Sequence, residues 1–154
     1  MKMLNTFALI LLLFACDSED NNPDESTSGF ADVTKVEVSG EEGNYRFAVT
    51  ITSPDTGCEQ YADWWEVLSL DGDLIHRRIL LHSHVDEQPF TRTGVGIDIS
   101  DNQLVYVRAH MNNTGYGGQV MKGTVEGDFE VTEVTEGFAA EVEDQEPLPG
   151  RCAF

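Results

Sequence analysis

Residues 57–92, GCEQYADWWEVLSLDGDLIHRRILLHSHVDEQPFTR, decide the fold class of this chain. Two apolar-rich runs, residues 61–70 and 74–84, flank the dipeptide Asp71-Gly72. An Asp-Gly pair between two such runs is the strongest short-range signal of a β-hairpin. We therefore expect an antiparallel pair of strands in the middle of the chain.

The segments on either side of this hairpin also show the two-residue period of half-buried strands. Residues 45–52 alternate between large apolar and smaller or polar side chains, and the turn residues of 40–43 precede them. No segment keeps a period of 3.6 residues. Further short strands are predicted around residues 36–38, 95–99, 103–111, 120–124, 128–134 and 138–142. This spacing is typical of an antiparallel β-sandwich of the immunoglobulin or fibronectin-III type, with a small β-barrel as the alternative.

Trp64 and Trp65 are adjacent in the predicted first strand of the hairpin. Neighbouring side chains on a strand point to opposite faces of the sheet. We expect one tryptophan to lie in the core and the other to pack under a loop. An exposed aromatic ring here could instead stack on a sugar, so a glycan is one possible ligand.

The net charge of the chain is −19, from 28 acidic and nine basic residues. Such a surface repels nucleic acids and anionic membranes, so the sequence predicts no nucleic-acid partner. The chain contains no GxSxG, HExxH, GxGxxG, P-loop or EF-hand pattern. These absences leave no catalytic residue to name and favour a binding or structural role. An enzyme would need a metal with an open coordination position and a bound water.

The first 16 residues have the features of an export signal that ends in a cysteine. Lys2 precedes the apolar run 7–14, which is too short to span a bilayer. The sequence Leu-Phe-Ala-Cys at 13–16 resembles the lipobox of bacterial lipoproteins, although Phe14 departs from the small residue usual there. The resemblance implies that Cys16 carries diacylglycerol and an amide-linked fatty acid such as palmitate, which together form a membrane anchor. The alternative is an ordinary signal peptide followed by an unmodified cysteine.

Residues 17–28, DSEDNNPDESTS, hold five acids and no aliphatic side chain, so we expect a disordered tether. An acidic run after the lipidated cysteine resembles the surface-export signal of Bacteroidota lipoproteins. In enteric bacteria, an aspartate in this place resembles an inner-membrane retention signal. We favour an outer-membrane, surface-exposed location in the cell envelope. The predicted organisation is a signal peptide over 1–15, a lipidated tether over 16–29 and one β-sandwich domain over 30–154.

Cys58 and Cys152 remain once Cys16 is acylated. Two cysteines in an exported domain are expected to form a disulfide, because the compartments outside the cytoplasm are oxidising. This bond would join the C-terminal tail to the loop before the tryptophans. The alternative is a pair of free thiols at a metal site, for which the chain lacks the usual CxxC spacing.

Three histidines form a candidate metal site for zinc or copper. His82 and His84 would share one face of a strand, about 6.6 Å apart, and His110 could join them from the 103–111 strand. Three imidazoles and a carboxylate suit zinc or copper(II). The alternative is a set of histidines hydrogen-bonded to carboxylates, without metal. The carboxylate could come from Asp63, Asp86 or Glu87.

Four arginines of the central region could bind an anionic ligand or pair with the many acids. They are Arg77, Arg78, Arg92 and Arg108. The stretches GCEQYADWWEVL (57–68), HSHVDEQPFTR (82–92) and VRAHMNN (107–113) are similar to a group of small secreted bacterial proteins, a resemblance that implies export and no particular chemistry. The sequence therefore predicts a lipid-anchored β-sandwich that binds a protein, a glycan or a metal.

Overall fold

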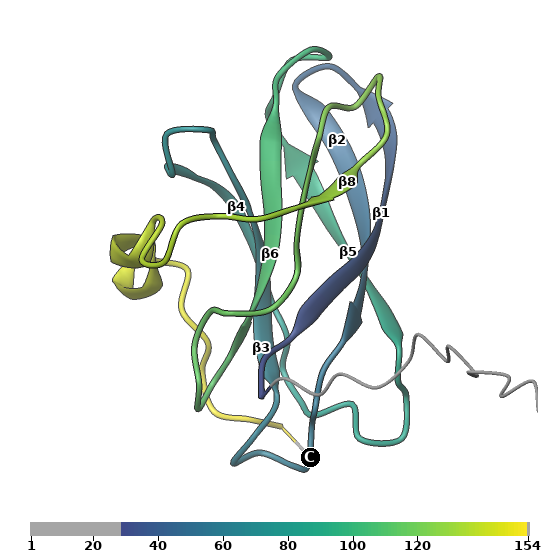
Figure 1. Ribbon diagram of the computed structural model, residues 1–154. Coiled ribbons are helices and arrows are strands. Elements are labelled where there is room, and N and C mark those ends of the chain that lie inside the picture. The colour runs from purple at the N-terminus through teal and green to yellow at the C-terminus, as the bar shows by residue number, and fades with distance from the viewer. Residues whose placement is uncertain (1–28, 154) are drawn as a thin grey trace, which may run out of the picture.

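The computed structural model describes residues 29–153, which form two antiparallel sheets packed face to face (Figure 1). The three-stranded sheet has the order β1-β2-β5 and consists of β1 (Asp32–Glu41), β2 (Asn44–Thr52) and β5 (Phe90–Ile97). The five-stranded sheet has the order β4-β3-β6-β7-β8 and consists of β4 (Leu74–Ile79), β3 (Ala62–Leu68), β6 (Val105–Met111), β7 (Val120–Gly123) and β8 (Glu130–Thr132). The predicted β-sandwich is confirmed, and the two sheets do not close into a barrel. The first seven strands follow the immunoglobulin-like order, with the fourth strand in the sheet of the third.

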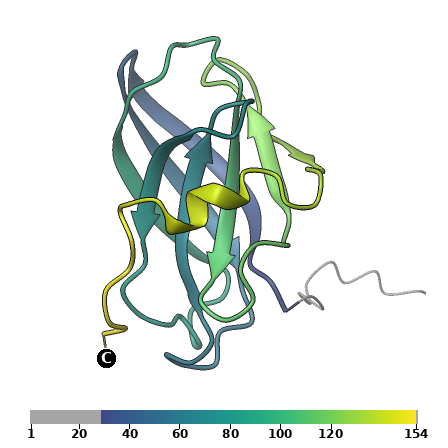
Figure 2. The same ribbon diagram turned by 90° about the vertical axis from the view of Figure 1, so that its left-hand side faces the viewer.

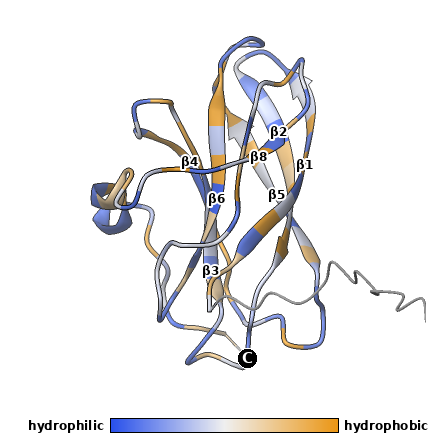
Figure 3. Cartoon of the chain, in the orientation of Figure 1, coloured by the Kyte–Doolittle hydropathy of each residue, from blue (hydrophilic) through white to orange (hydrophobic). Residues whose placement is uncertain are grey.

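The core lies between the two sheets and is built from alternate residues of each strand. Its largest fully buried side chains include Trp65, Phe47, Phe90 and Ile51. Figure 3 shows the apolar and polar residues alternating along the strands. The predicted hairpin is confirmed: β3 pairs with β4 around Asp71-Gly72, where Gly72 has a φ of +93°. Within residues 29–153, no helix is long and apolar enough to cross a membrane.

The strand β5 begins at Phe90, earlier than the predicted start at residue 95, and Gly94 lies in the part that the prediction missed. The first half of β5 pairs with β2, although its alternation is weakened by glycine. A Cβ atom on Gly94 would lie 2.6 Å from the Trp65 ring and 2.6 Å from His76 Nε2. The missing side chain therefore makes room for the core tryptophan of the opposite sheet.

The predicted strand over residues 138–142 is wrong. A turn and the 3-10 helix η1 (Ala140–Asp144) occupy this region. Ala139 and Val142 lie three residues apart, a spacing that puts both on one side of such a helix. They pack with Leu68 of β3 in a second, smaller apolar cluster. The apolar residues that suggested a strand thus cover the outside of the sheet.

Residues 133–153, which we call the C-terminal strap, cross the outer face of the five-stranded sheet (Figure 2). The disulfide between Cys58 and Cys152 fastens the end of the strap, with a Cα–Cα distance of 5.7 Å. The backbone N–H of Ala153 also donates to the carbonyl of Leu81 at 2.6 Å. The predicted disulfide is therefore present, and it joins the strap to the loop that precedes β3.

Candidate functional site

A buried carboxylate, Glu66, lies at the centre of the outer face of the five-stranded sheet. The strand register places it between Arg77 of β4 and Arg108 of β6. Arg77 donates to Glu66 Oε2 at 2.9 and 2.7 Å, and Arg108 donates to Oε1 at 2.8 Å. All three side chains are almost completely shielded from solvent. Buried charges are tolerated when they are paired and hydrogen-bonded in this way.

The two arginines also hold the C-terminal strap through its backbone. Arg77 donates to the carbonyl oxygens of Val142 at 2.6 Å, Gln145 at 2.6 Å and Pro147 at 3.3 Å. Arg108 donates to the carbonyls of Phe138 at 2.7 Å and Ala139 at 2.9 Å. Each guanidinium nitrogen of both residues therefore has a partner within the chain. Pairing with acids, the second interpretation of these arginines, is confirmed here.

The two adjacent tryptophans lie on opposite faces of β3, as predicted. Trp65 is in the core, and Trp64 lies on the outer face, where only 3% of it is exposed. The His110 ring stacks on Trp64 with a centroid distance of 3.6 Å. The Arg77 guanidinium lies 4.5 Å from the centre of the same ring, in cation–π geometry. Trp64 is therefore already covered and is not free to stack on a sugar.

His110 lies between two carboxylates. Its Nδ1 is 2.7 Å from Asp63 Oδ1, and its Nε2 is 3.3 Å from Glu143 Oε1 of η1. The register between β3 and β6 shifts between Ala62 and Trp64, which brings the Asp63 side chain to the outer face. His110 thus ties the helix of the strap to the sheet.

His82 and His84 follow β4 in a loop, because the chain leaves the five-stranded sheet after Ile79 to enter the other sheet. Their rings are 4.5 Å apart, and the buried His84 ring stacks on Phe90 at 3.8 Å. The backbone N–H of His84 donates to Asp55 Oδ2 at 2.8 Å. Burial lowers the pKa of His84, as do the neighbouring charges of Arg92 and His82.

The structure does not bring the three predicted metal ligands together. His84 is held by Asp55, whereas His110 stacks on Trp64 and contacts Asp63 and Glu143. Within residues 29–153, no three or more His, Cys, Asp and Glu side chains form a group that could hold a metal ion. The strand assumed for His82 and His84 ends too early, and each buried histidine has a structural contact instead. We therefore assign neither zinc nor copper to His82, His84 and His110.

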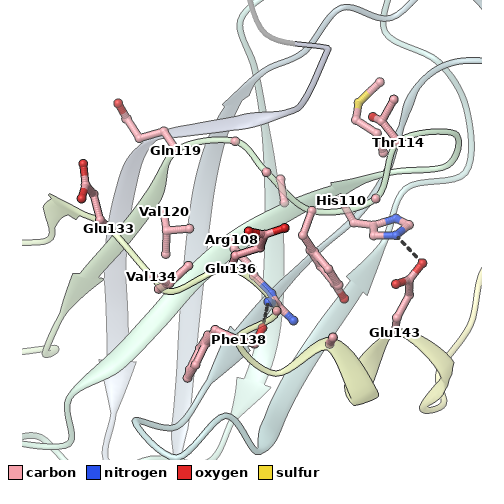
Figure 4. A pocket seen from close by; sticks show the side chains of 18 of the residues that line it. Arg108, His110, Thr114, Gln119, Val120, Glu133, Val134, Glu136, Phe138 and Glu143 are labelled. Carbon is pink, nitrogen blue, oxygen red and sulfur yellow. Dashed lines mark hydrogen bonds and ion pairs between the residues drawn. The ribbon is translucent and has the colours of Figure 1, made fainter.

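A pocket of about 920 Å³ lies beside this network, between the 112–119 loop, β6, β7 and residues 131–143 (Figure 4). Phe138, Val120 and Val134 contribute apolar surface to it. The carboxylates that line it come from Glu133, Glu136 and Glu143, and its neutral polar side chains include Asn113, Thr114, Gln119, Thr132 and Thr135. Arg108 is the one lysine or arginine among the lining residues, and its nitrogens are already paired.

Tyr116 forms part of the pocket wall above Arg108. The Arg108 guanidinium lies 3.5 Å from the centre of its ring. Burial and the charge of Glu66 raise the pKa of Tyr116 well above its ordinary value, so its hydroxyl stays protonated at neutral pH. The Tyr116 hydroxyl oxygen is itself buried, so the pocket offers carboxylates, amides and the ring of Tyr116, and no free cation among its described side chains.

Sequence reasoning missed both Glu66 and the pocket. Glu66 carried a usable signal, since it is a single acid inside the otherwise apolar run Trp64–Leu68, and Arg77 lies in the second strand of the same hairpin. The pocket carried no such signal. One of its walls is the strap, and the position of the strap depends on contacts between residues far apart in the sequence.

No protein-family model matches the chain, and no solved structure matches it. One curated protein, from Halomicrobium mukohataei, is 39% identical over 108 residues, which cover 70% of this chain and 52% of that protein. It is named "Putative lipoprotein". The chain thus spans about half the length of this relative.

Proposed function

We propose that the chain is an exported lipoprotein, held in the cell envelope by a lipid on Cys16, and that its β-sandwich is a ligand-binding module. The name of the relative supports the lipoprotein assignment, as does the Leu-Phe-Ala-Cys sequence at residues 13–16. Cys16 and the acidic tract lie outside the described residues. In this proposal residues 1–15 are the signal peptide, 16–29 the anchored tether and 30–154 the domain. The acidic tract is the support for an outer-membrane, surface-exposed location.

The pocket beside Arg108 is the observation that carries the binding role. A concave site of this size, with apolar walls and a few polar groups, is the usual form of a small-ligand site. The charged side chains beside the pocket join the strap to the sheet. Arg108 binds Glu66 and the strap, and His110 contacts Asp63 and Glu143. These residues shape the pocket, and the charge of Arg108 is already paired with that of Glu66.

The lining of the pocket points to a neutral, hydroxyl-rich ligand such as a glycan. Three carboxylates face the pocket, so it repels anions. Carboxylate oxygens accept hydrogen bonds from hydroxyl groups, and the amides of Asn113 and Gln119 both donate and accept. Tyr116 and Phe138 supply aromatic surface of the kind that packs against sugar rings.

The lipid anchor is tested by replacing Cys16 with serine. The wild-type chain, expressed with its own signal, should incorporate labelled fatty acid and sediment with membranes. The Cys16→Ser chain should incorporate none and appear in the soluble or unprocessed fraction. Fatty-acid labelling of the variant at the wild-type level would refute the anchor.

The pocket is tested by filling it in the soluble Cys16→Ser chain. Val134 lines the pocket and is partly exposed, so Val134→Trp should occupy the space with little effect on the core. On an array of neutral and acidic glycans, the chain with Val134 intact should bind neutral glycans only, and Val134→Trp should lose this binding. Val95→Trp is a matched control, because Val95 is 56% exposed on β5 and does not line the pocket. Equal binding by both variants would place the ligand elsewhere.

A further inference from the structure

The start of the described chain, its C-terminal tail and three loops lie together at one end of the sandwich, at the bottom of Figure 1. Thr114 Oγ1 donates to the carbonyl of Gly29 at 2.7 Å, and Asn112 Nδ2 donates to the carbonyl of Cys58 at 2.9 Å. The backbone N–H of Ala153 donates a hydrogen bond to the carbonyl of Leu81. We call this the tether end, because residues 17–28 lead directly into it. It comprises residues 29–31, 53–61, 80–89, 112–119 and 150–153.

The two ends of the sandwich differ sharply in charge. The loops of the opposite end contain eight acids and neither lysine nor arginine: Glu41, Glu42, Asp71, Asp73, Asp98, Asp101, Glu126 and Asp128. The tether end contains four acids and Arg151. Of these acids, Asp55 is buried, and Glu87 pairs with Arg92 at 2.7 Å. Counting Arg92 as the partner of Glu87, four acids and two arginines leave the tether end with a net charge of −2, against −8 at the opposite end.

The same end exposes apolar side chains in the loop between β4 and β5. Leu81 is 57% exposed and Val85 is 50% exposed. The opposite end also has two exposed leucines, Leu70 at 43% and Leu104 at 42%, but they lie among the eight acids. A single exposed leucine needs no explanation. The distinguishing feature of Leu81 and Val85 is their position on the weakly charged end, next to the start of the tether.

We propose that the 80–89 loop rests on the lipid surface, with Leu81 and Val85 in contact with its interfacial region. This inference rests on the proposed anchor at Cys16. From there, the 12 residues 17–28 can extend at most about 40 Å, so the tether end stays close to the bilayer. Tethering raises the effective concentration of the loop at the membrane, so a weak apolar contact is enough to orient the domain.

The charge distribution predicts both the orientation and the kind of membrane. The eight acids of the opposite end point away from the bilayer when the 80–89 loop faces it. No basic cluster lies at the tether end, where Arg151 is the one unpaired basic residue of the described loops, so anionic lipids should not strengthen the contact. A zwitterionic surface is the partner that fits.

Hydrogen–deuterium exchange on the lipidated full-length chain tests the proposal. The chain is placed in phosphatidylcholine nanodiscs and compared with the Cys16→Ser chain mixed with empty nanodiscs. We expect exchange in residues 80–89 to slow several-fold only in the anchored sample, while residues 98–104 keep the same rate. Equal rates in residues 80–89 of both samples would overturn the proposal. So would equal protection in a concentrated sample of the free chain, since that would indicate self-association.

Two double variants separate the apolar contact from mere proximity. Leu81→Ser with Val85→Ser should remove the protection of the loop, although the chain still floats with the nanodiscs. Leu70→Ser with Leu104→Ser, similarly exposed leucines at the opposite end, should leave the protection unchanged. Protection that survives the first double variant would overturn the proposal.

Failure of the anchor is distinguished from failure of the membrane contact by attaching the chain artificially. Residues 17–154 carrying an N-terminal polyhistidine tag can be bound to phosphatidylcholine nanodiscs that contain a nickel-chelating lipid. Protection of residues 80–89 in this sample would support the membrane contact even if Cys16 proves unmodified. Absence of protection would refute the contact whatever the fate of Cys16.

Discussion

Trp64 and Trp65 are neighbours on β3, and both are buried, but the two faces of the strand are buried by different means. The inner face, with Trp65, is covered by the apolar side chains of the opposite sheet. The outer face, with Trp64 and Glu66, is covered by the strap, whose backbone carbonyls bind two arginines. The inner face thus depends on shape and apolar area, and the outer face depends on pairing every buried charge.

The largest expected effect is the loss of the charge at the centre of the outer face. Glu66→Ala leaves Arg77 and Arg108 buried without their counter-ion, which should lower the free energy of unfolding by about 3–5 kcal/mol. Urea denaturation measures this loss. Replacing Glu66, Arg77 and Arg108 together by Leu, Met and Met should not restore stability, because five strap carbonyls would lose their donors. Full recovery in the triple variant would show that the strap does not need the arginines.

The next effect comes from releasing the end of the strap. Cys58→Ala with Cys152→Ala removes a link between residues 94 positions apart in the sequence, which should cost about 2–4 kcal/mol. Hydrogen–deuterium exchange should quicken first in residues 138–147, while β2 and β5 keep their protection. Uniform loss of protection across both sheets would contradict the distinction between the two faces.

A smaller effect is expected from overpacking the inner face. The added methyl of Gly94→Ala would lie 2.6 Å from the rigid Trp65 ring, so the sheets must shift, at a cost of about 1–3 kcal/mol. The thermal midpoint should fall accordingly. Gly150→Ala is the matched control, since nothing lies within 4 Å of the methyl that it adds. Equal midpoints for the two variants would mean that the core accommodates the extra methyl.

The smallest effect concerns pH. Burial lowers the pKa of His84, so the unfolded chain binds more protons than the folded chain once the pH falls below about 6.5. Stability should therefore decrease from pH 7 toward pH 5. The charged groups nearest the ring are Arg92, His82, Asp55 and Glu87. His84→Gln should reduce the slope of stability against pH over this range, as measured by urea denaturation. An unchanged slope would show that His84 does not contribute to it.

The local features of the fold could be predicted because they depend on short-range chemistry. The Asp71-Gly72 turn, the alternation of residues 45–52 and the opposite directions of the two tryptophans all follow from backbone geometry. The disulfide could be predicted because two cysteines remain in an exported chain when Cys16 is set aside for lipidation. These signals were enough to predict an antiparallel β-sandwich.

The candidate site was decided by tertiary structure. Residues 138–142 have apolar side chains compatible with a strand, but they form a turn and part of η1 because Ala139 and Val142 pack on Leu68 outside the sheet. His110 is far in sequence from both Asp63 and Glu143: the pairing of β3 with β6 brings it to Asp63, and the crossing of the strap brings Glu143 to it.

The sequence by itself therefore determined the fold class, the central hairpin and the covalent link between Cys58 and Cys152. It also determined the strong negative net charge. Tertiary structure decided that Glu66 would pair with two arginines, that the histidines would separate and that a pocket would form. The physical reason is that strand periodicity acts over two residues, whereas burying a charge or enclosing a pocket requires groups from distant segments to meet.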